Sequence, residues 1–139
     1  MRYLVDTDVC INIIRSKDSS ILKKVFSEEI EQMSISSITV AELECGAAKS
    51  SNPAQASLAL AQFLSAVYVW DFDQRAACCY GKLRAELEKE GKRIGPYDML
   101  IAAQALAEKL VLITNNYREF ERVKGLCIES WSEFDLADL

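Results

Sequence analysis

The feature of this sequence that most constrains its fold is the alternation of short, continuous apolar runs with longer segments of helical periodicity. The apolar runs predict strands at residues 3–5, 33–36, 67–70, 111–113 and 126–128. Helical spacing predicts helices at residues 9–14, 20–29, 40–49, 53–65, 74–90 and 96–109. Continuous apolar strands are typical of a parallel sheet that helices cover on both faces. We therefore expect an α/β fold, a three-layer α/β/α sandwich with a parallel sheet of four or five strands.

Length and hydropathy fit one domain that does not enter a membrane. The chain has 139 residues, 50% of them hydrophobic, and a domain usually holds about 100–200 residues. We find no internal repeat, linker or low-complexity segment, so we expect a single domain over residues 1–139. The most apolar stretch, residues 57–70, is interrupted by Gln62 and Ser65. It falls short of the roughly 18 apolar residues that a membrane-spanning helix needs.

The amino terminus and the cysteines indicate a cytoplasmic protein. Asp6 interrupts the first apolar run before a signal-peptide apolar region can form. The five cysteines are an odd set without Cys-x-x-Cys spacing, which argues against a disulfide framework and against a zinc ribbon. We therefore expect buried free thiols and a cytoplasmic location.

The absence of histidine excludes several classes of active site. Ser-His-Asp and Cys-His nucleophile systems, histidine-containing zinc sites and histidine general bases all need a residue that the chain lacks. We therefore expect carboxylates to carry any chemistry. The net charge of −5 has the wrong sign for holding nucleic acid by bulk attraction. A nucleic-acid partner would need local basic patches or bridging cations.

Acidic side chains follow the predicted strands at positions that a parallel sheet brings to one edge. Asp6 ends the first strand, Glu42 is expected in the first turn of the helix after the second, and Asp98 lies in the first turn of a later helix. The polar residues that follow the fourth strand are Thr114, Asn115, Asn116 and Glu119. Because parallel folds bind ligands where the carboxyl ends of the strands meet, we expect these residues to converge.

An all-oxygen set of this kind suits a hard cation. Clustered carboxylates repel one another unless a cation or shared protons neutralise them, and Mg²⁺ or Mn²⁺ is the natural occupant. Each acid also has a purely structural interpretation. Asp6 fits an Asx turn, Asp8 can N-cap the next helix, Thr39 and Glu42 fit a capping box, and Asp98 fits an acidic first helical turn.

Four motifs, in order along nearly the whole chain, resemble those of the VapC toxin family of PIN-domain ribonucleases. They are YLVDTD at residues 3–8, SSITVAELECG at 36–46, IGPYD at 94–98 with IAA at 101–103, and TNNYREFERV at 114–123. The resemblance implies a PIN-like fold and a toxic endoribonuclease that depends on Mg²⁺, with Mn²⁺ as a substitute. The family's metal-binding acidic triad matches Asp6, Glu42 and Asp98, and Asn116 or Glu119 matches the fourth catalytic position.

Further positions are assigned from the same resemblance. Thr7, Asp8 and Thr114 are expected to lie just behind the metal ligands, with Thr114 ordering this corner by hydrogen bonding. Three residues depart from the family pattern: Asp8 and Tyr97 stand where Asn is usual, and Gln104 stands where relatives often carry His. None of the three removes an acid of the triad, so we expect activity to survive.

The resemblance also implies partners and a reaction. We expect a homodimer with both sites facing a shared groove, a VapB-type antitoxin that neutralises the toxin, and an RNA substrate, either tRNA or rRNA. Hydrolysis by an activated water should leave a 5′-phosphate and a 3′-hydroxyl. Beside the predicted acidic edge, the basic residues expected to hold the RNA backbone are Arg118, Arg122 and Lys124.

Two other functions compete with this interpretation. The Asp6-Thr7-Asp8 sequence after an apolar strand also fits the nucleophile motif of haloacid-dehalogenase-type phosphatases. Those enzymes need an acidic pair after a late strand, where this chain has Asn115 and Asn116. The other alternative is a binding module without catalysis, in which the acidic edge only docks a basic segment of a partner.

Overall fold

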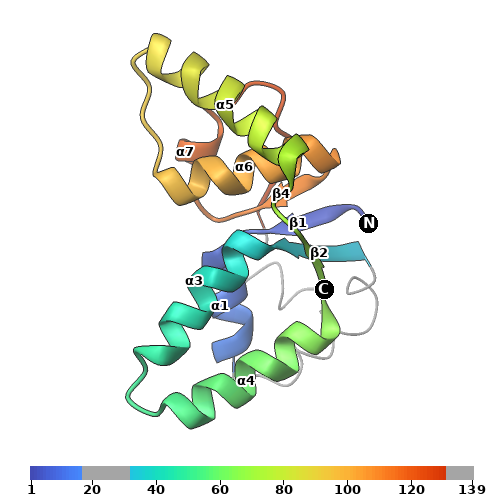
Figure 1. Cartoon of the computed structure of the whole chain (residues 1–139), viewed down its shortest axis with the longest axis vertical. Coiled ribbons are helices and arrows are strands. Elements are labelled where there is room, and N and C mark those ends of the chain that lie inside the picture. The colour runs from blue at the N-terminus through green and yellow to red at the C-terminus, as the bar shows by residue number, and fades with distance from the viewer. Residues whose placement is uncertain (17–31, 131–139) are drawn as a thin grey trace.

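Five parallel strands form the centre of the computed structural model of the chain (Figure 1), which describes residues 1–16 and 32–130. The strands are β1 (Tyr3–Val5), β2 (Met33–Ser36), β3 (Tyr68–Trp70), β4 (Val111–Ile113) and β5 (Ile128–Glu129). The helices are α1 (Thr7–Arg15), α3 (Ser37–Ala48), α4 (Pro53–Ala66), α5 (Gln74–Lys89), α6 (Pro96–Glu108) and α7 (Tyr117–Phe120). The helix predicted at residues 20–29 lies outside the described residues.

The order of the strands places a topological switch point at the junction of β1 and β4. The sheet has the order β3-β2-β1-β4-β5, and every neighbouring pair is parallel. The chain therefore builds outward from β1 in one direction and then returns to add β4 and β5 on the other side. Strand order reverses at the junction of β1 and β4, which is where open parallel sheets bind their ligands.

Helices cover both faces of the sheet. One layer contains α1, α3 and α4, and the other contains α5, α6 and α7 (Figure 1). The predicted three-layer α/β/α sandwich with a parallel sheet is confirmed, with five strands. No helix within residues 1–16 and 32–130 has the length and apolar character needed to cross a membrane.

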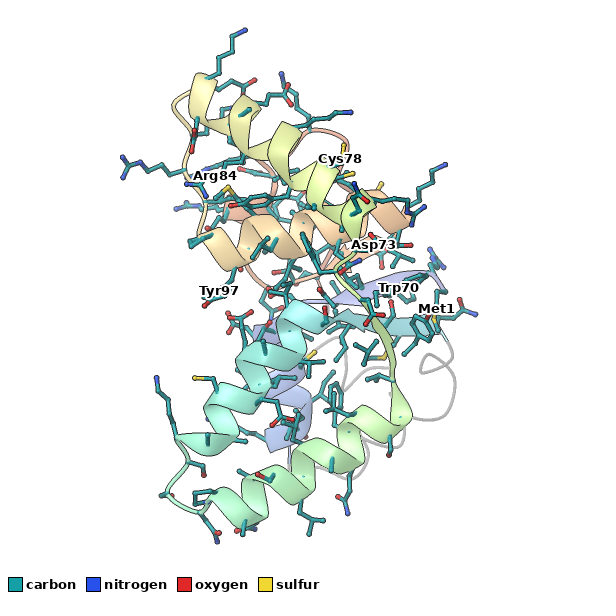
Figure 2. The ribbon with its side chains drawn as sticks, in the orientation of Figure 1. Met1, Trp70, Asp73, Cys78, Arg84 and Tyr97 are labelled. Atoms are coloured by element: carbon teal, nitrogen blue, oxygen red, sulfur yellow. The ribbon has the colours of Figure 1, made fainter. Side chains whose placement is uncertain are left out.

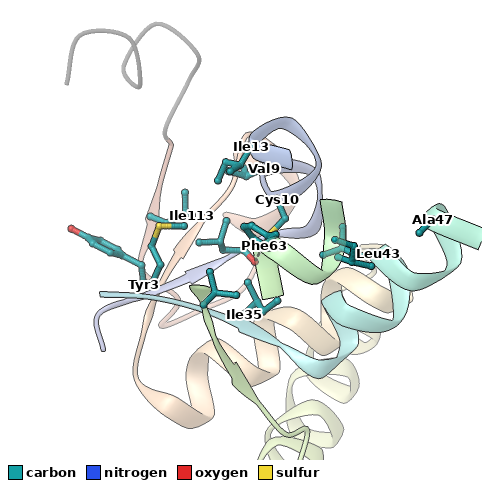
Figure 3. Packing of buried hydrophobic residues seen from close by; sticks show 13 residues of the cluster. Tyr3, Val9, Cys10, Ile13, Ile35, Leu43, Ala47, Phe63 and Ile113 are labelled. Carbon is teal, nitrogen blue, oxygen red and sulfur yellow. Dashed lines mark hydrogen bonds between the residues drawn. The ribbon is translucent and has the colours of Figure 1, made fainter. Parts of the chain in front are cut away.

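Alternate residues of the strands enter two separate cores. Leu4 of β1 packs with the α5–α6 layer, whereas Tyr3 and Val5 on either side of it pack with the layer of α1, α3 and α4 (Figure 3). This division follows from the two-residue repeat of a strand, whose successive side chains point to opposite faces. The strands are short, but burial on both faces fixes their register, because a slip by one residue would exchange the two faces.

Two helices begin earlier than the sequence suggests. Helix α1 starts at Thr7 with Asp6 as N-cap, so the interpretation of Asp8 as the N-cap is wrong. Helix α3 starts at Ser37 behind the N-cap Ser36, whose hydroxyl accepts from the Ile38 N–H. Each helix follows its strand with no intervening loop, a geometry that hydrophobic periodicity does not reveal.

The position of Glu42 changes as a consequence. Because α3 begins at Ser37, Thr39 lies inside the helix and Glu42 lies in its second turn. The predicted capping box of these two residues and the placement of Glu42 in the first turn are both wrong. The prediction for α5 is confirmed at both ends: Asp73 caps it by accepting from the Ala76 N–H, and Gly91, with φ of 68°, stops it.

The cysteines differ in burial, contrary to expectation. All five are free thiols, as expected, but only Cys10 is fully buried, and Cys45, Cys78 and Cys127 are exposed. The helix faces explain part of this difference. The buried residues of α5 are Ala76, Leu83 and Leu87. Cys78 belongs to the same helix but is exposed (Figure 2).

Replacing Ser36 with Ala should destabilise the fold. The buried Ser36 hydroxyl accepts from the Ile38 N–H at 3.1 Å and donates to Oε1 of buried Gln104 at 2.9 Å. The S36A variant removes the cap of α3 and leaves the amide oxygen of Gln104 without this donor. We expect urea denaturation to show a loss of about 1–3 kcal/mol in the free energy of unfolding.

The matched control is Ser65→Ala, because the exposed Ser65 hydroxyl only donates to the Gln62 carbonyl at the end of α4. This variant should stay within about 0.5 kcal/mol of the wild type. Equal stability of S36A and the wild type would contradict a capping role for Ser36.

Candidate active site

Asp6 lies at the junction of β1 and β4, held by the strand next to its own. Its backbone N–H donates to the Ile113 carbonyl at 2.9 Å, and its Oδ2 accepts from the Thr114 hydroxyl at 2.7 Å. Both side chains are buried. The Thr114 oxygen also accepts from the Asn116 N–H at 3.0 Å. Thr114 therefore fixes the orientation of the Asp6 carboxylate and the start of the chain segment after β4.

Glu42 reaches the same edge from the second turn of α3. The Thr7 hydroxyl at the start of α1 lies 2.8 Å from Glu42 Oε1 and 3.1 Å from the Thr39 hydroxyl. Since a carboxylate only accepts, Thr7 donates to Glu42 and accepts from Thr39. The two threonines therefore connect α1 with α3, and they aim the Glu42 carboxylate at the amino end of α1.

Asp98 lies in the first turn of α6. We refer to Asp6, Glu42 and Asp98 together as the carboxylate cluster. Burial is the largest cause that raises the pKa of Asp98 to about 7, followed by repulsion from Asp6, Glu119, Glu42 and Asp8. The charges of Asp6, Glu119, Glu42 and Asp8 therefore lie near enough to Asp98 to disfavour its ionised form. This repulsion shows why the carboxylate cluster needs neutralising charge.

The pKa of Asp6 is raised as well, again mainly by burial. The hydrogen bond from Thr114 opposes this rise, whereas the charges of Asp8 and Glu42 add to it. Asp8 is exposed in the first turn of α1 and bears on the site through its charge. An aspartate at this position therefore adds negative charge to the site, where an asparagine would add none.

Glu119 lies at the border of the carboxylate cluster, and both of its carboxylate oxygens accept hydrogen bonds. Its Oε1 accepts from the Gly95 N–H and its Oε2 from the Asn116 side-chain amide, each at 2.5 Å. A β-carbon at Gly95 would lie 3.5 Å from Asp98 Oδ2 and 3.6 Å from Glu119 Oε1, so Gly95 occupies the narrow space between the two acids. Glu119 thus connects α7 with the loop that enters α6.

Helix α7 was not predicted from the sequence. It has four residues, too few for hydrophobic periodicity to appear. The signal that could have found it is the spacing of Asn116 and Glu119, an N-cap residue followed three positions later by an acid. In the structure the side chains of these two residues bond directly to each other.

The chemistry of the acidic residues suits a hard divalent cation, although their arrangement does not form a metal site. Within residues 1–16 and 32–130, no three acidic or cysteine side chains are placed so that they could hold a metal ion together. The donor set is nevertheless all oxygen, and burial with mutual repulsion raises the pKa values of Asp6 and Asp98. A cation would reverse that electrostatic cost, because it favours the ionised form of each acid.

The two other departures from the family pattern lie in different places. Gln104 is fully buried, where it accepts from the Ser36 hydroxyl and donates to the Asp71 carbonyl at 3.3 Å. It therefore links β2 and α6 through the interior. Tyr97 is 56% exposed and projects from the amino end of α6, next to Asp98 in the sequence (Figure 2).

The structure separates the basic residues that the sequence groups together. Arg118 and Arg122 line an open pocket whose other lining residues are Arg93, Ile94, Gly95, Asn116 and Glu119. Lys124 instead pairs with two glutamates at the carboxyl end of α5, at 2.9 Å from the C-cap Glu90 and 3.6 Å from Glu86. Arg93 was not among the basic residues predicted to hold RNA, because it lies in the turn between α5 and α6, far from residues 118–122 along the chain.

A family model and individual relatives identify the same protein family. The sequence model described as "PIN domain" matches residues 3–126. The chain is 41% identical over 132 residues to the tRNA(fMet)-specific endonuclease VapC of Shigella flexneri, covering 95% of this chain and 99% of that protein. It is 42% identical over 131 residues to ribonuclease VapC2 of Haemophilus influenzae, covering 94% and 98% of the two chains.

Solved structures agree with the sequence relatives. The chain superposes with a TM-score of 0.89 and 42% identity on a chain of the DNA-bound VapBC complex of Salmonella typhimurium, covering 94% of this chain and 98% of that one. For the VapBC2 complex of Rickettsia felis, bound to a DNA fragment of its promoter, the TM-score is 0.87 at 37% identity, with coverage of 95% and 100%.

The metal-free protein should become less stable as the pH rises from about 4 to about 7. In this window the folded chain keeps a proton on Asp98, whose pKa is about 7, while the unfolded chain has already lost it. Stability falls with pH wherever the folded state binds more protons. Urea denaturation in EDTA at several pH values measures the slope, which Asp98→Asn should flatten.

The matched control is Asp73→Asn, because Asp73 caps α5 outside the carboxylate cluster and Asn also serves as an N-cap. This variant should keep the slope of the wild type. The same slope for the wild type and for Asp98→Asn would contradict the raised pKa.

Proposed function

Because the chain belongs to the PIN domain family, we propose that it is a metal-dependent endoribonuclease that acts as the toxin of a toxin–antitoxin pair. The observation that carries the proposal is the cluster of Asp6, Glu42 and Asp98 at the carboxyl edge of the sheet, where Asp98 has a pKa of about 7. Relatives that match over nearly their whole length are named ribonucleases. Their names support a nuclease function for the same cluster.

The cofactor we propose is Mg²⁺, with Mn²⁺ as a substitute, held by Asp6, Asp98 and Glu42. When bound, such an ion lowers the pKa of a water molecule and offsets the negative charge that develops on a phosphate. Thr114 and Thr7 keep the Asp6 and Glu42 carboxylates oriented by their hydrogen bonds. Asn116 and Glu119 complete the catalytic set in this proposal, with Glu119 positioning the loop before Asp98 through the Gly95 N–H.

The products expected from this site are a 5′-phosphate and a 3′-hydroxyl. A metal ion held by the proposed carboxylates would supply an activated water molecule, and histidine, the commonest general base for attack by the ribose 2′-hydroxyl, is absent from the chain. Hydrolysis by water needs no attack by the 2′-hydroxyl. A cyclic 2′,3′-phosphate among the products would contradict this route.

The substrate class we propose is structured RNA, with initiator tRNA as the leading candidate and ribosomal RNA as the alternative. Relatives from Shigella flexneri and Salmonella typhimurium, 41% and 42% identical to this chain, are named tRNA(fMet)-specific endonucleases. Their identity extends over at least 94% of this chain. A shared substrate is therefore the most direct hypothesis.

We also propose a VapB-type antitoxin as partner, with the toxin itself forming a homodimer in the cytoplasm. The similar solved structures are VapBC complexes. A mainly apolar pocket between α1, α3 and α4 offers a surface for such a partner. Residues that line it include Ile11, Ile14, Ala56, Ala59 and, towards the acidic cluster, Glu42. A segment seated there would lie beside the carboxylates and restrict access of RNA.

Cleavage of RNA by the purified chain tests the central proposal. Initiator tRNA and ribosomal RNA are incubated with the protein and Mg²⁺, Mn²⁺ or EDTA, and the cut ends are mapped by sequencing. We expect cleavage at a defined site with either metal and none with EDTA. Asp98→Asn and Glu42→Gln should lower the rate by at least about a hundredfold, because each removes a proposed metal ligand.

Glu44→Gln is the matched control, since Glu44 lies on α3 two residues from Glu42 but is exposed. It should cleave at the rate of the wild type. Para-nitrophenyl phosphate is offered in parallel, and hydrolysis of that ester without RNA cleavage would favour the phosphatase alternative. The wild type and Asp98→Asn are also expressed in bacteria, and growth is followed. Growth arrest by both proteins would favour a binding module without catalysis.

A further inference from the structure

Three arginines that have no carboxylate partner within residues 1–16 and 32–130 gather beside the acidic cluster. Among the described residues, Arg2, Arg75 and Arg84 form ion pairs with carboxylates. The arginines for which the described part of the chain supplies no such pair are Arg15, Arg93, Arg118 and Arg122. Three of these four line the open pocket next to Gly95. Three guanidinium groups for which the described chain supplies no carboxylate partner therefore meet at one place on the surface.

Two chain segments build this arginine pocket, defined by Arg93, Arg118 and Arg122. Arg93 comes from the turn between α5 and α6, whereas Arg118 and Arg122 come from α7 and the turn after it. The Arg122 guanidinium donates to the Arg93 carbonyl, which holds the two segments together without neutralising any charge. The Gly95 N–H bond to Glu119 joins the same segments a short way further along.

The neighbouring lysines do not contribute free charge to the arginine pocket. Lys92, next to Arg93 in the chain, pairs with Glu90 at 3.4 Å, and Lys124 pairs with Glu90 at 2.9 Å. The one acid in the pocket wall, Glu119, has both carboxylate oxygens occupied by N–H donors. Three guanidinium groups against one hydrogen-bonded carboxylate leave a local positive charge in a chain whose net charge is −5.

The arginine pocket lies next to Asp98, separated from it by Gly95. Gly95 is part of the pocket lining, and a β-carbon on Gly95 would lie 3.5 Å from Asp98 Oδ2. A nucleic-acid strand whose cleaved phosphate lies at the carboxylate cluster would carry its next phosphates past this position. Guanidinium groups bind phosphate through paired N–H donors, which makes arginine the suitable residue type for such an interaction.

We propose that Arg93, Arg118 and Arg122 form a subsite for a backbone phosphate of the RNA strand, one that flanks the bond cleaved at the carboxylate cluster. This inference rests on the proposed nuclease function. It adds a specific site at which the acidic protein binds the RNA backbone. Arg93 is a substrate-binding residue in this arrangement, and Lys124 is not. Glu119 separates the arginine pocket from the carboxylate cluster, so that cation and phosphate each have a site of matching charge.

RNA binding measured without cleavage tests the subsite. The probe is a fluorescein-labelled single-stranded RNA of 20 nucleotides, titrated with the full chain in EDTA and followed by fluorescence anisotropy at several salt concentrations. Arg93→Ala and Arg118→Ala should each raise Kd about fivefold to tenfold. The slope of log Kd against log salt should fall by about 0.7 for each phosphate that a variant no longer neutralises.

Two further variants make the test specific. Arg93→Lys should keep the salt slope of the wild type, because it keeps the charge. Lys124→Ala should stay within about twofold of the wild type, because Lys124 pairs with the two glutamates at the carboxyl end of α5. Thermal unfolding checks that all variants are folded, which their exposed positions favour.

Several results would overturn the subsite. One is an unchanged Kd and salt slope in both Arg93→Ala and Arg118→Ala. Another is an equal loss of affinity in Lys124→Ala, which would indicate diffuse charge attraction. In a third experiment, a decaglutamate peptide replaces the RNA in the titration. If Arg93→Ala weakens binding of this peptide but not of RNA, the ligand of the arginine pocket is an acidic protein segment.

The outcome is separable from that of the nuclease proposal. If the arginine variants lose RNA affinity but the wild type cleaves no RNA with Mg²⁺ or Mn²⁺, the subsite stands and the nuclease proposal falls. If the wild type cleaves RNA and the arginine variants bind like the wild type, only the subsite falls.

Discussion

The hydrogen bond from Thr114 to Asp6 joins the carboxyl ends of β1 and β4, and the arrangement of the site depends on it. The two residues are 108 positions apart in the chain, yet their side chains meet at 2.7 Å in a buried position. A buried carboxylate is costly unless it is hydrogen-bonded or paired with positive charge. Thr114 meets part of that requirement for Asp6, and the remainder favours a cation.

Glu42 and Glu119 are held in place by hydrogen bonds of the same kind. Thr7 orients Glu42, and the Gly95 N–H and the Asn116 amide orient Glu119. Asp6, Glu42 and Glu119 thus each accept a hydrogen bond from a different segment of the chain. Asp98 stands among four other carboxylates that raise its pKa. Carboxylates that repel one another carry an electrostatic cost that a bound divalent ion would remove.

The separation of charge gives a chain of net charge −5 a positive surface next to an acidic one. Acidic side chains gather at the junction of β1 and β4, and the three guanidinium groups of the arginine pocket gather on the far side of Gly95. Gly95 and Glu119 form the boundary between the two regions. Net charge therefore describes this chain poorly, because attraction to a polyanion depends on local charge at the distance of a direct interaction.

Local patterns predicted most of the secondary structure but not its fine boundaries. The strands at β1, β2 and β4 have the predicted bounds, and β3 begins one residue later than predicted. Strand β5 is displaced towards Glu129, where two residues pair with β4. The starts of α1 and α3 were misplaced because their caps, Asp6 and Ser36, directly follow or end the preceding strands. Hydrophobic periodicity carries no information on such direct transitions.

The sequence by itself determined the α/β class, the parallel sheet and the positions of Asp6, Glu42 and Asp98 near one edge. The class and the sheet follow from hydrophobic periodicity, which is encoded within short segments. The shared edge follows from the order in which strands and helices alternate along the chain. Only the tertiary structure decided that Glu119 binds the Gly95 N–H, that Lys124 faces α5, and that Arg93 joins Arg118 and Arg122. Those interactions join segments distant in sequence, so they depend on how the helices pack and not on any local preference.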